Sequence, residues 1–153
     1  MRIQTIGVIG SGLMGSGIAQ VAAYSGLDVT LVDIDQPRVD AGIAGIRKRL
    51  EREAERGRIT SADCEAACNR ITGAADWETL GSLRQVDAVI EAVVEDLGVK
   101  SGIFKRLGGV CRPEALLASN TSSLPLSDLA AASGRPERVI GLHFFNPPWA
   151  LKL

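Results

Sequence analysis

The sequence predicts a Rossmann-type α/β fold, in which a doubly wound, mostly parallel sheet carries helices on both faces. Three observations predict it. Short apolar runs alternate with helical patterns along the chain. The first apolar run leads into a glycine loop that opens a helix, and the second ends on an aspartate. A length of 153 residues is enough for one sizeable core, so we expect a single domain over residues 1–153.

The bulk composition excludes several classes of protein. A net charge of −1 gives no reason to expect nucleic acid or an anionic membrane as a partner. The chain has no apolar run of roughly 18 residues and begins directly with a strand pattern, so we expect no membrane or signal segment and a cytoplasmic location. Three cysteines argue against a disulfide framework. No metal site is expected, because Cys64 and Cys68 lack further ligands and His143 is the only histidine.

A G-x-G-x-x-G motif joins the apolar run at 3–9 to a helical pattern at 14–25. Gly10 suits the tight turn, Gly12 lets a pyrophosphate approach, and Gly15 lets helix and strand pack closely. The free N–H groups and dipole of the helix start favour a diphosphate. Such a loop alone also fits an ordinary turn. The predicted cofactor contacts of the loop are Gly10, Gly12, Leu13, Met14 and Gly15.

The second predicted strand, at 27–33, ends on Asp33, about 20 residues after the glycine loop. A carboxylate there accepts hydrogen bonds from both adenosine ribose hydroxyls and repels the extra phosphate of NADP. Ile34 and Asp35 follow, and neither can pair with that phosphate. The sequence therefore predicts NAD as the cofactor. The alternative is that Asp33 caps the following helix.

The remaining elements continue the alternation. The patterns predict helices at 37–56, from Thr60 or Ser61 to 69, at 96–110 and at 126–132, and strands at 70–74 (weakly), 86–92, 116–119 and 139–143. Residues 76–83 fit a helical turn or loop. Alternating strands and helices with short connections predict a parallel sheet with right-handed crossovers. In such a sheet the polar clusters that follow the strands lie at one edge.

Four motifs in order resemble the N-terminal NAD-binding domain of the 3-hydroxyacyl-CoA dehydrogenase family. They are GSGLMGSGIA at 10–19, IEAVVE at 90–95 with Lys100, ASNTSSL at 118–124, and GLHFFNP at 141–147. The resemblance covers nearly the whole chain. It implies NAD as cofactor, an acyl-CoA substrate and a place in fatty-acid β-oxidation. The implied reaction is hydride transfer between NAD and C3 of a 3-hydroxyacyl-CoA.

The resemblance also implies roles for matching residues. His143 is the implied catalytic histidine and takes the 3-hydroxyl proton, a task that suits an imidazole. Ser122 is implied to bind the reacting oxygen and to contact cofactor and substrate, and Asn146 to lie beside the same centre and the cofactor. Glu95 and Lys100 are implied cofactor contacts. From the residues alone, His143 also fits a structural role, Glu95 and Lys100 a solvated pair, and residues 120–123 a capping loop.

Three arginines, Arg49, Arg52 and Arg56, recur on one face of the second helix. The resemblance implies that Arg49 and Arg56 contact the phosphates of coenzyme A, for which guanidinium groups are suited. A solvated surface stripe is the alternative.

Members of the resembled family carry a second, helical domain that completes the acyl-binding cleft and forms a homodimer. They also place a glutamate, which orients the histidine, at a position that would fall just after residue 153. We therefore expect a truncated fragment with weak activity. The alternatives are a non-catalytic NAD-binding or structural module, and a domain of the 3-hydroxyacid dehydrogenase type. The latter shares the glycine loop and lacks the His-Phe-Phe-Asn-Pro run.

Overall fold

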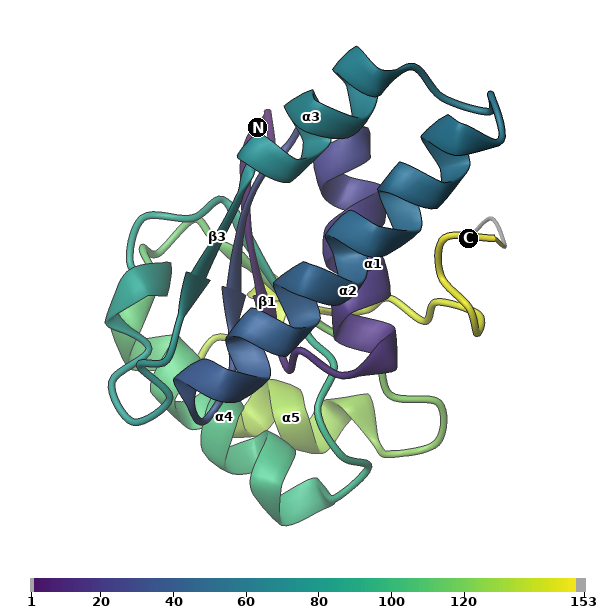
Figure 1. Ribbon diagram of the computed structural model, residues 1–153. Helices are drawn as coiled ribbons and strands as arrows, with labels where there is room; N and C mark the ends of the chain where they lie inside the picture. The colour runs from purple at the N-terminus through teal and green to yellow at the C-terminus, as the bar shows by residue number, and fades with distance from the viewer. Residues whose placement is uncertain (1, 151–153) are drawn as a thin grey trace.

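One six-stranded parallel sheet forms the centre of the molecule, and the computed structural model describes residues 2–150 (Figure 1). The strand order is β3-β2-β1-β4-β5-β6, so the order reverses between β1 and β4. This is the Rossmann arrangement, which confirms the predicted fold class. The strands are β1 (Thr5–Ile9), β2 (Asp28–Val32), β3 (Ile71–Ala74), β4 (Ala88–Glu91), β5 (Leu116–Ser119) and β6 (Val139–Gly141).

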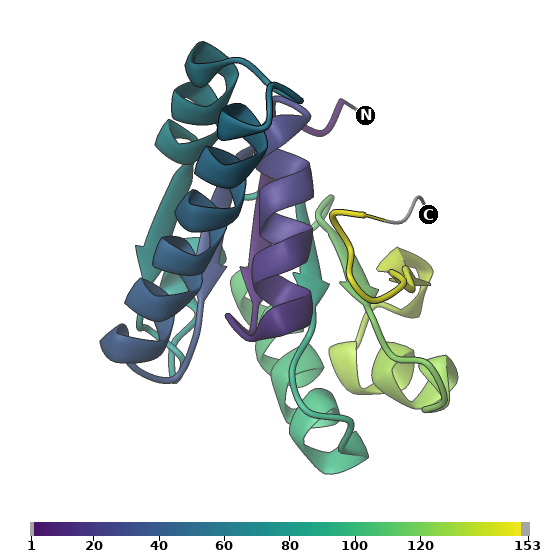
Figure 2. The same ribbon diagram turned by 45° about the vertical axis from the view of Figure 1, so that its right-hand side comes forward.

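Helices cover both faces of the sheet (Figures 1 and 2). Three of them pack together on one face, and the other two pack against each other on the opposite face. The first group is α1 (Leu13–Tyr24), α2 (Gln36–Glu55) and α3 (Ser61–Asn69), and the second is α4 (Leu97–Val110) and α5 (Leu126–Ser133). Short 3-10 turns at Gly81–Leu83 and Pro136–Arg138 complete the elements.

The core consists of two apolar clusters, one on each side of the sheet. Strand β4 contributes to both, because successive side chains point to opposite faces. Ala88 and Ile90 belong to the cluster under α1, whereas Val89 packs with Phe104 of α4 and Leu129 of α5. All four residues of β4 are buried, as expected for an inner strand of a parallel sheet.

The predicted elements are all present, with most ends displaced by one or two residues. The weak strand candidate is the edge strand β3, and residues 76–83 form turns that end in 3-10 conformation. The predicted last strand, 139–143, is too long, because β6 ends at Gly141. Gly141 pairs with Ser119, the last residue of β5, so the ladder has no partner beyond it. His143 consequently lies in the loop that follows β6.

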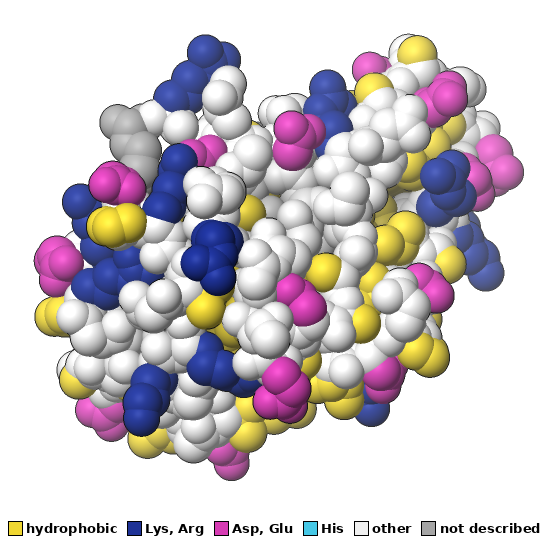
Figure 3. All heavy atoms as spheres, turned by 90° about the vertical axis from the view of Figure 1, so that its left-hand side faces the viewer, with side chains coloured by type: hydrophobic (Ala, Val, Ile, Leu, Met, Phe, Trp, Pro, Cys, Tyr) yellow, Lys and Arg dark blue, Asp and Glu magenta, His cyan; other side chains and the backbone are white. Residues whose placement is uncertain are grey.

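Neither membrane-spanning helices nor groups of metal-binding side chains occur among the described residues. None of the helices within residues 2–150 is long and apolar enough to cross a membrane. In the same range, no group of three or more His, Cys, Asp or Glu side chains is placed to hold a metal ion. On the face shown in Figure 3, acidic and basic side chains are interspersed.

Candidate cofactor and active site

The glycine loop between β1 and α1 has a shape that fits a dinucleotide. Gly10 has a φ of 98°, and a Cβ on it would lie 2.7 Å from the Ala92 carbonyl oxygen. A Cβ on Gly15 would lie 1.7 Å from the Gly10 carbonyl oxygen. A Cβ on Gly12, by contrast, would have no atom of residues 2–150 within 4 Å. The protein itself therefore requires Gly10 and Gly15, whereas Gly12 leaves open space for a ligand.

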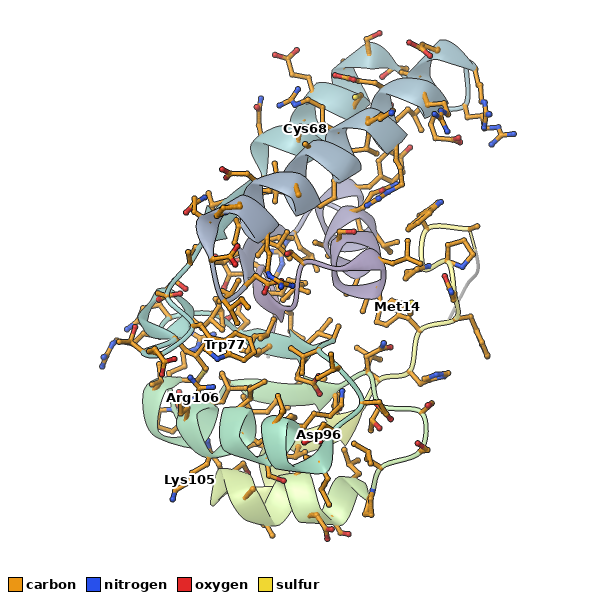
Figure 4. The ribbon with its side chains drawn as sticks, turned by 60° about the horizontal axis from the view of Figure 1, so that its bottom comes forward. Met14, Cys68, Trp77, Asp96, Lys105 and Arg106 are labelled. Carbon is orange, nitrogen blue, oxygen red and sulfur yellow. The ribbon has the colours of Figure 1, made fainter. Side chains whose placement is uncertain are left out.

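The start of α1 is prepared for an anion. Gly12 is the N-cap residue, and in the described part of the chain no side chain caps the helix or places a negative charge in its first turn. The first N–H groups and the positive end of the helix dipole thus face the open space at Gly12. Leu13 is 56% exposed beside them, and Met14 follows it in the first turn of α1 (Figure 4). A diphosphate fits this position.

Asp33 follows β2 directly and is held in a fixed orientation. Its Oδ2 accepts hydrogen bonds from Ser11 N at 2.7 Å and Ser11 Oγ at 2.6 Å, and its Oδ1 accepts one from Ile34 N at 2.7 Å. Partial burial acts to raise the pKa of Asp33, but these hydrogen bonds and the charge of Arg38 outweigh it and lower the pKa. Asp33 is not a helix cap, because Asp35 caps α2 by accepting from Arg38 N at 2.8 Å.

Lys100 lies inside the protein, against two carboxylates. Its Nζ is 2.6 Å from Glu91 Oε1 and 3.3 Å from Glu95 Oε2, and the side chain is 1% exposed. The alternative of a solvated pair is therefore wrong for Lys100, whereas the Glu95 side chain is 39% exposed. Glu91 is fully buried at the end of β4 and was not predicted as a site residue. The available signal was a carboxylate inside an otherwise apolar strand.

Glu95 anchors the loop that contains Ser122. Its Oε1 accepts hydrogen bonds from the Thr121 hydroxyl and from the backbone N–H of Ser122 at 3.2 Å and Ser123 at 3.4 Å. Burial acts to raise the pKa of Glu95, but the Thr121 hydrogen bond and the Lys100 charge lower the pKa to about 2. The loop is not the cap of α5, since the N-cap residue of that helix is Pro125 and no side chain caps it.

The loops carrying Ser122 and His143 are tied together at the carboxyl edge of the sheet. They follow the neighbouring strands β5 and β6, and Asn120 Oδ1 accepts a hydrogen bond from Phe144 N at 2.7 Å. The side chains of Ser122, His143 and Asn146 are all exposed. The His143 ring meets the Phe145 ring edge-on, with centroids 5.6 Å apart.

Arg49 bridges α2, α1 and the last described segment, residues 147–150. Its Nε donates to Gln20 Oε1 at 2.6 Å, its Nη2 donates to Ser16 Oγ at 3.1 Å, and its guanidinium lies 4.3 Å from the centre of the Trp149 ring. Trp149 also packs on α1, because a Cβ on Gly17 would lie 2.8 Å from the indole. Trp149 was not predicted as a contact of this site, and it has no charge or motif to signal it.

Arg52 and Arg56 differ from Arg49 in having exposed side chains. Arg56 pairs with Glu53 at 3.4 Å near the end of α2. A cavity of about 470 Å³ lies between α1, α2 and residues 144–150, with Glu53 and Trp149 among its lining residues. The predicted arginine stripe is therefore divided into one partly buried and two exposed members.

Together, the strand order, the glycine loop and the carboxylate at the end of β2 define a dinucleotide-binding domain of the dehydrogenase kind. Residues 5–153 match the family model described as 3-hydroxyacyl-CoA dehydrogenase, NAD binding domain. The chain belongs to that family, and its cofactor is NAD.

Named relatives agree with the family. The probable 3-hydroxybutyryl-CoA dehydrogenase of Bacillus subtilis (strain 168) is 44% identical over 100% of this chain and 52% of its own length. The 3-hydroxyadipyl-CoA dehydrogenase of Escherichia coli (strain K12) is also 44% identical, over 100% of this chain and 32% of its own. A crystal structure of 3-hydroxybutyryl-CoA dehydrogenase from E. coli K12 superposes with a TM-score of 0.93 at 44% identity, covering 99% of this chain and 32% of that chain. The chain thus spans about a third to about half of the length of these relatives.

Proposed function

We propose that this chain is the NAD-binding part of an enzyme that transfers hydride between C3 of a 3-hydroxyacyl-CoA and NAD. The hydrogen bond from Phe144 N to Asn120 Oδ1 carries the proposal. It keeps the loops of Ser122 and His143 side by side at the edge where a Rossmann fold binds its dinucleotide. A module that only bound NAD would have no need for an exposed histidine and serine held together there.

The chemistry follows from the residue types. His143 takes the proton from the 3-hydroxyl as the substrate is oxidised and returns it in the reverse reaction, because an imidazole exchanges protons near neutral pH. Ser122 donates a hydrogen bond to the reacting oxygen, and Asn146 contributes an amide from the same segment as His143. NAD, when bound, supplies the hydride acceptor.

The substrate class rests on the relatives and on α2. The relatives named above are dehydrogenases of 3-hydroxybutyryl-CoA and 3-hydroxyadipyl-CoA. Within residues 2–150, Arg49 uses Nε on Gln20 and Nη2 on Ser16, and we assign its Nη1 to a phosphate oxygen. Arg56 is exposed further along the helix. We assign both to the phosphates of coenzyme A.

The relatives are longer than this chain, and the part that it does not match has functions of its own in our proposal. We propose that the remainder of their length supplies the acyl-binding cleft, the partner carboxylate of His143 and the contacts of a homodimer. Within residues 2–150 no carboxylate forms an ion pair with His143. The 153-residue chain is therefore expected to bind NAD and to turn over little. Comparable rates for this chain and its full-length parent would contradict the division.

The test is acetoacetyl-CoA-dependent oxidation of NADH by the full-length protein that contains this chain. His143→Gln should lower kcat by about 10²- to 10⁴-fold, the usual contribution of general acid–base catalysis. Its Kd for NAD should stay within about twofold of the wild type, because the exposed His143 side chain makes no hydrogen bond within residues 2–150 and its replacement should leave the loop in place. NAD binding without any acetoacetyl-CoA-dependent oxidation of NADH would instead identify a non-catalytic module.

A further inference from the structure

Glu91 is a buried ionisable group that the chemistry above does not use. It is the last residue of β4, it is 0% exposed, and it lies beneath the edge of the sheet that binds the cofactor. A carboxylate in such a position is strongly unfavourable unless all of its oxygens are paired. Its partners therefore indicate why the fold keeps it.

Both oxygens of Glu91 are fully engaged. Oε1 accepts hydrogen bonds from Lys100 Nζ at 2.6 Å and from Val93 N at 2.7 Å. Oε2 accepts one from Ser119 Oγ at 2.7 Å. Lys100 is 1% exposed and Ser119 is 0% exposed, so the whole group is shielded from water. Hydrogen bonds in such a network are stronger and better oriented than exposed ones.

Two routes lead from Glu91 to the loop that contains Ser122. The first passes through Lys100 to Glu95, which accepts hydrogen bonds from the N–H of Ser122 and from the Thr121 hydroxyl. The second passes through Ser119, whose Oγ accepts a hydrogen bond from Thr121 N at 3.2 Å. Both routes end on the same loop, so Glu91 is linked to it through Glu95 and through Ser119.

The loop that contains Ser122 lies on the side of the sheet where the nicotinamide half of NAD would bind. The pyrophosphate of a dinucleotide lies at the glycine loop and the adenosine ribose at the carboxylate after β2. The other half must then extend across the switch point, over the ends of β4 and β5. We propose that Glu91 is a positioning residue for the nicotinamide half of NAD, acting through Lys100 and Ser119 without contacting the cofactor. This inference rests on NAD binding by the chain.

Strand β4 supplies a matched control at its other end. Asp87 immediately precedes β4 and is 9% exposed; it pairs with Arg112 and accepts hydrogen bonds from Gln4 N at 2.7 Å and Thr5 N at 2.8 Å. It is a shielded, fully paired carboxylate at the amino edge of the sheet, away from the cofactor. Asp87→Asn therefore reproduces the loss of a paired charge without touching the loop.

The experiment is calorimetric titration of the chain with NAD and with ADP, which lacks the nicotinamide half. Glu91→Gln should weaken NAD binding about tenfold, the equivalent of one hydrogen bond to a charged group, and leave ADP binding within about twofold. Ser119→Ala breaks the second route with a smaller loss of stability and should weaken NAD selectively in the same direction. Asp87→Asn should keep the wild-type ratio of NAD to ADP affinity.

The outcomes separate the possibilities. An equal loss of NAD and ADP affinity in the Glu91 and Ser119 variants would show that Glu91 is merely structural. Unchanged NAD affinity in folded Ser119→Ala and Glu91→Gln would also overturn the inference. If Glu91→Gln does not fold, Ser119→Ala decides between these results. Failure of the wild-type chain to bind NAD would contradict the cofactor assignment itself.

Discussion

Replacing Gly12 with alanine is predicted to separate folding from cofactor binding. Gly12 has a φ of −66°, which alanine adopts freely, and a Cβ placed on it would have no atom within 4 Å among the residues that the structure describes. The lower entropy of the unfolded alanine variant favours folding by about 0.4–1 kcal/mol. The preference for glycine over alanine at an N-cap opposes it by a similar amount. The Tm should therefore stay within about 2 °C of the wild type.

The same methyl group enters the space that a pyrophosphate would occupy at the start of α1. Overpacking at a close contact costs about 1–3 kcal/mol, which raises the Kd for NAD about 5- to 140-fold. The assay combines NAD titration with thermal unfolding of the unliganded chain. Gly102→Ala, whose Cβ on α4 also meets no atom within 4 Å, is the control and should keep wild-type NAD affinity. Wild-type affinity in Gly12→Ala, or its failure to fold, would refute the reasoning.

Three further predictions follow from the site. NADP should bind about 5- to 140-fold more weakly than NAD, because its 2′-phosphate meets the Asp33 carboxylate; equal binding would exclude that role. Glu95 has a pKa of about 2 in the folded chain, below its usual 4.5, so it stabilises the fold above pH 4.5 and this stability is lost as the pH falls towards 2. Denaturant unfolding of Glu95→Gln across that range should lack this part of the pH dependence. Arg49→Gln and Arg56→Gln should raise the KM of the full-length enzyme for acyl-CoA and leave the KM for NAD unchanged; an unchanged acyl-CoA KM would make both residues surface groups.

Local pattern was enough to predict the fold. Apolar runs of strand length and helical patterns identify the elements, and the alternation of strands with helices predicts the parallel sheet. The last strand was predicted too long because its apolar pattern continues beyond Gly141. Pairing stops there for a reason outside that segment, namely the end of β5 at Ser119. A strand boundary set by its neighbour cannot be read from one stretch of sequence.

The cofactor loop was more predictable than the ion pairs around it. Glycine reports a backbone requirement at its own position, so Gly10 and Gly15 could be assigned from spacing alone. The burial of Lys100 depends on Glu91, which lies nine positions earlier at the end of β4 and accepts a hydrogen bond from the Lys100 ammonium group. A lysine in a helix is usually exposed. Only the three-dimensional arrangement shows that this one is held inside.

Gly17 carries a consequence for comparing related sequences. It lies just after the dinucleotide motif, yet the atoms that require it to be small belong to Pro148 and Trp149, not to a phosphate site. A related chain with a larger residue at this position should keep its phosphate loop and route its segment after the histidine differently. Position 17 is therefore a marker of how that segment docks, and it carries no information about cofactor choice.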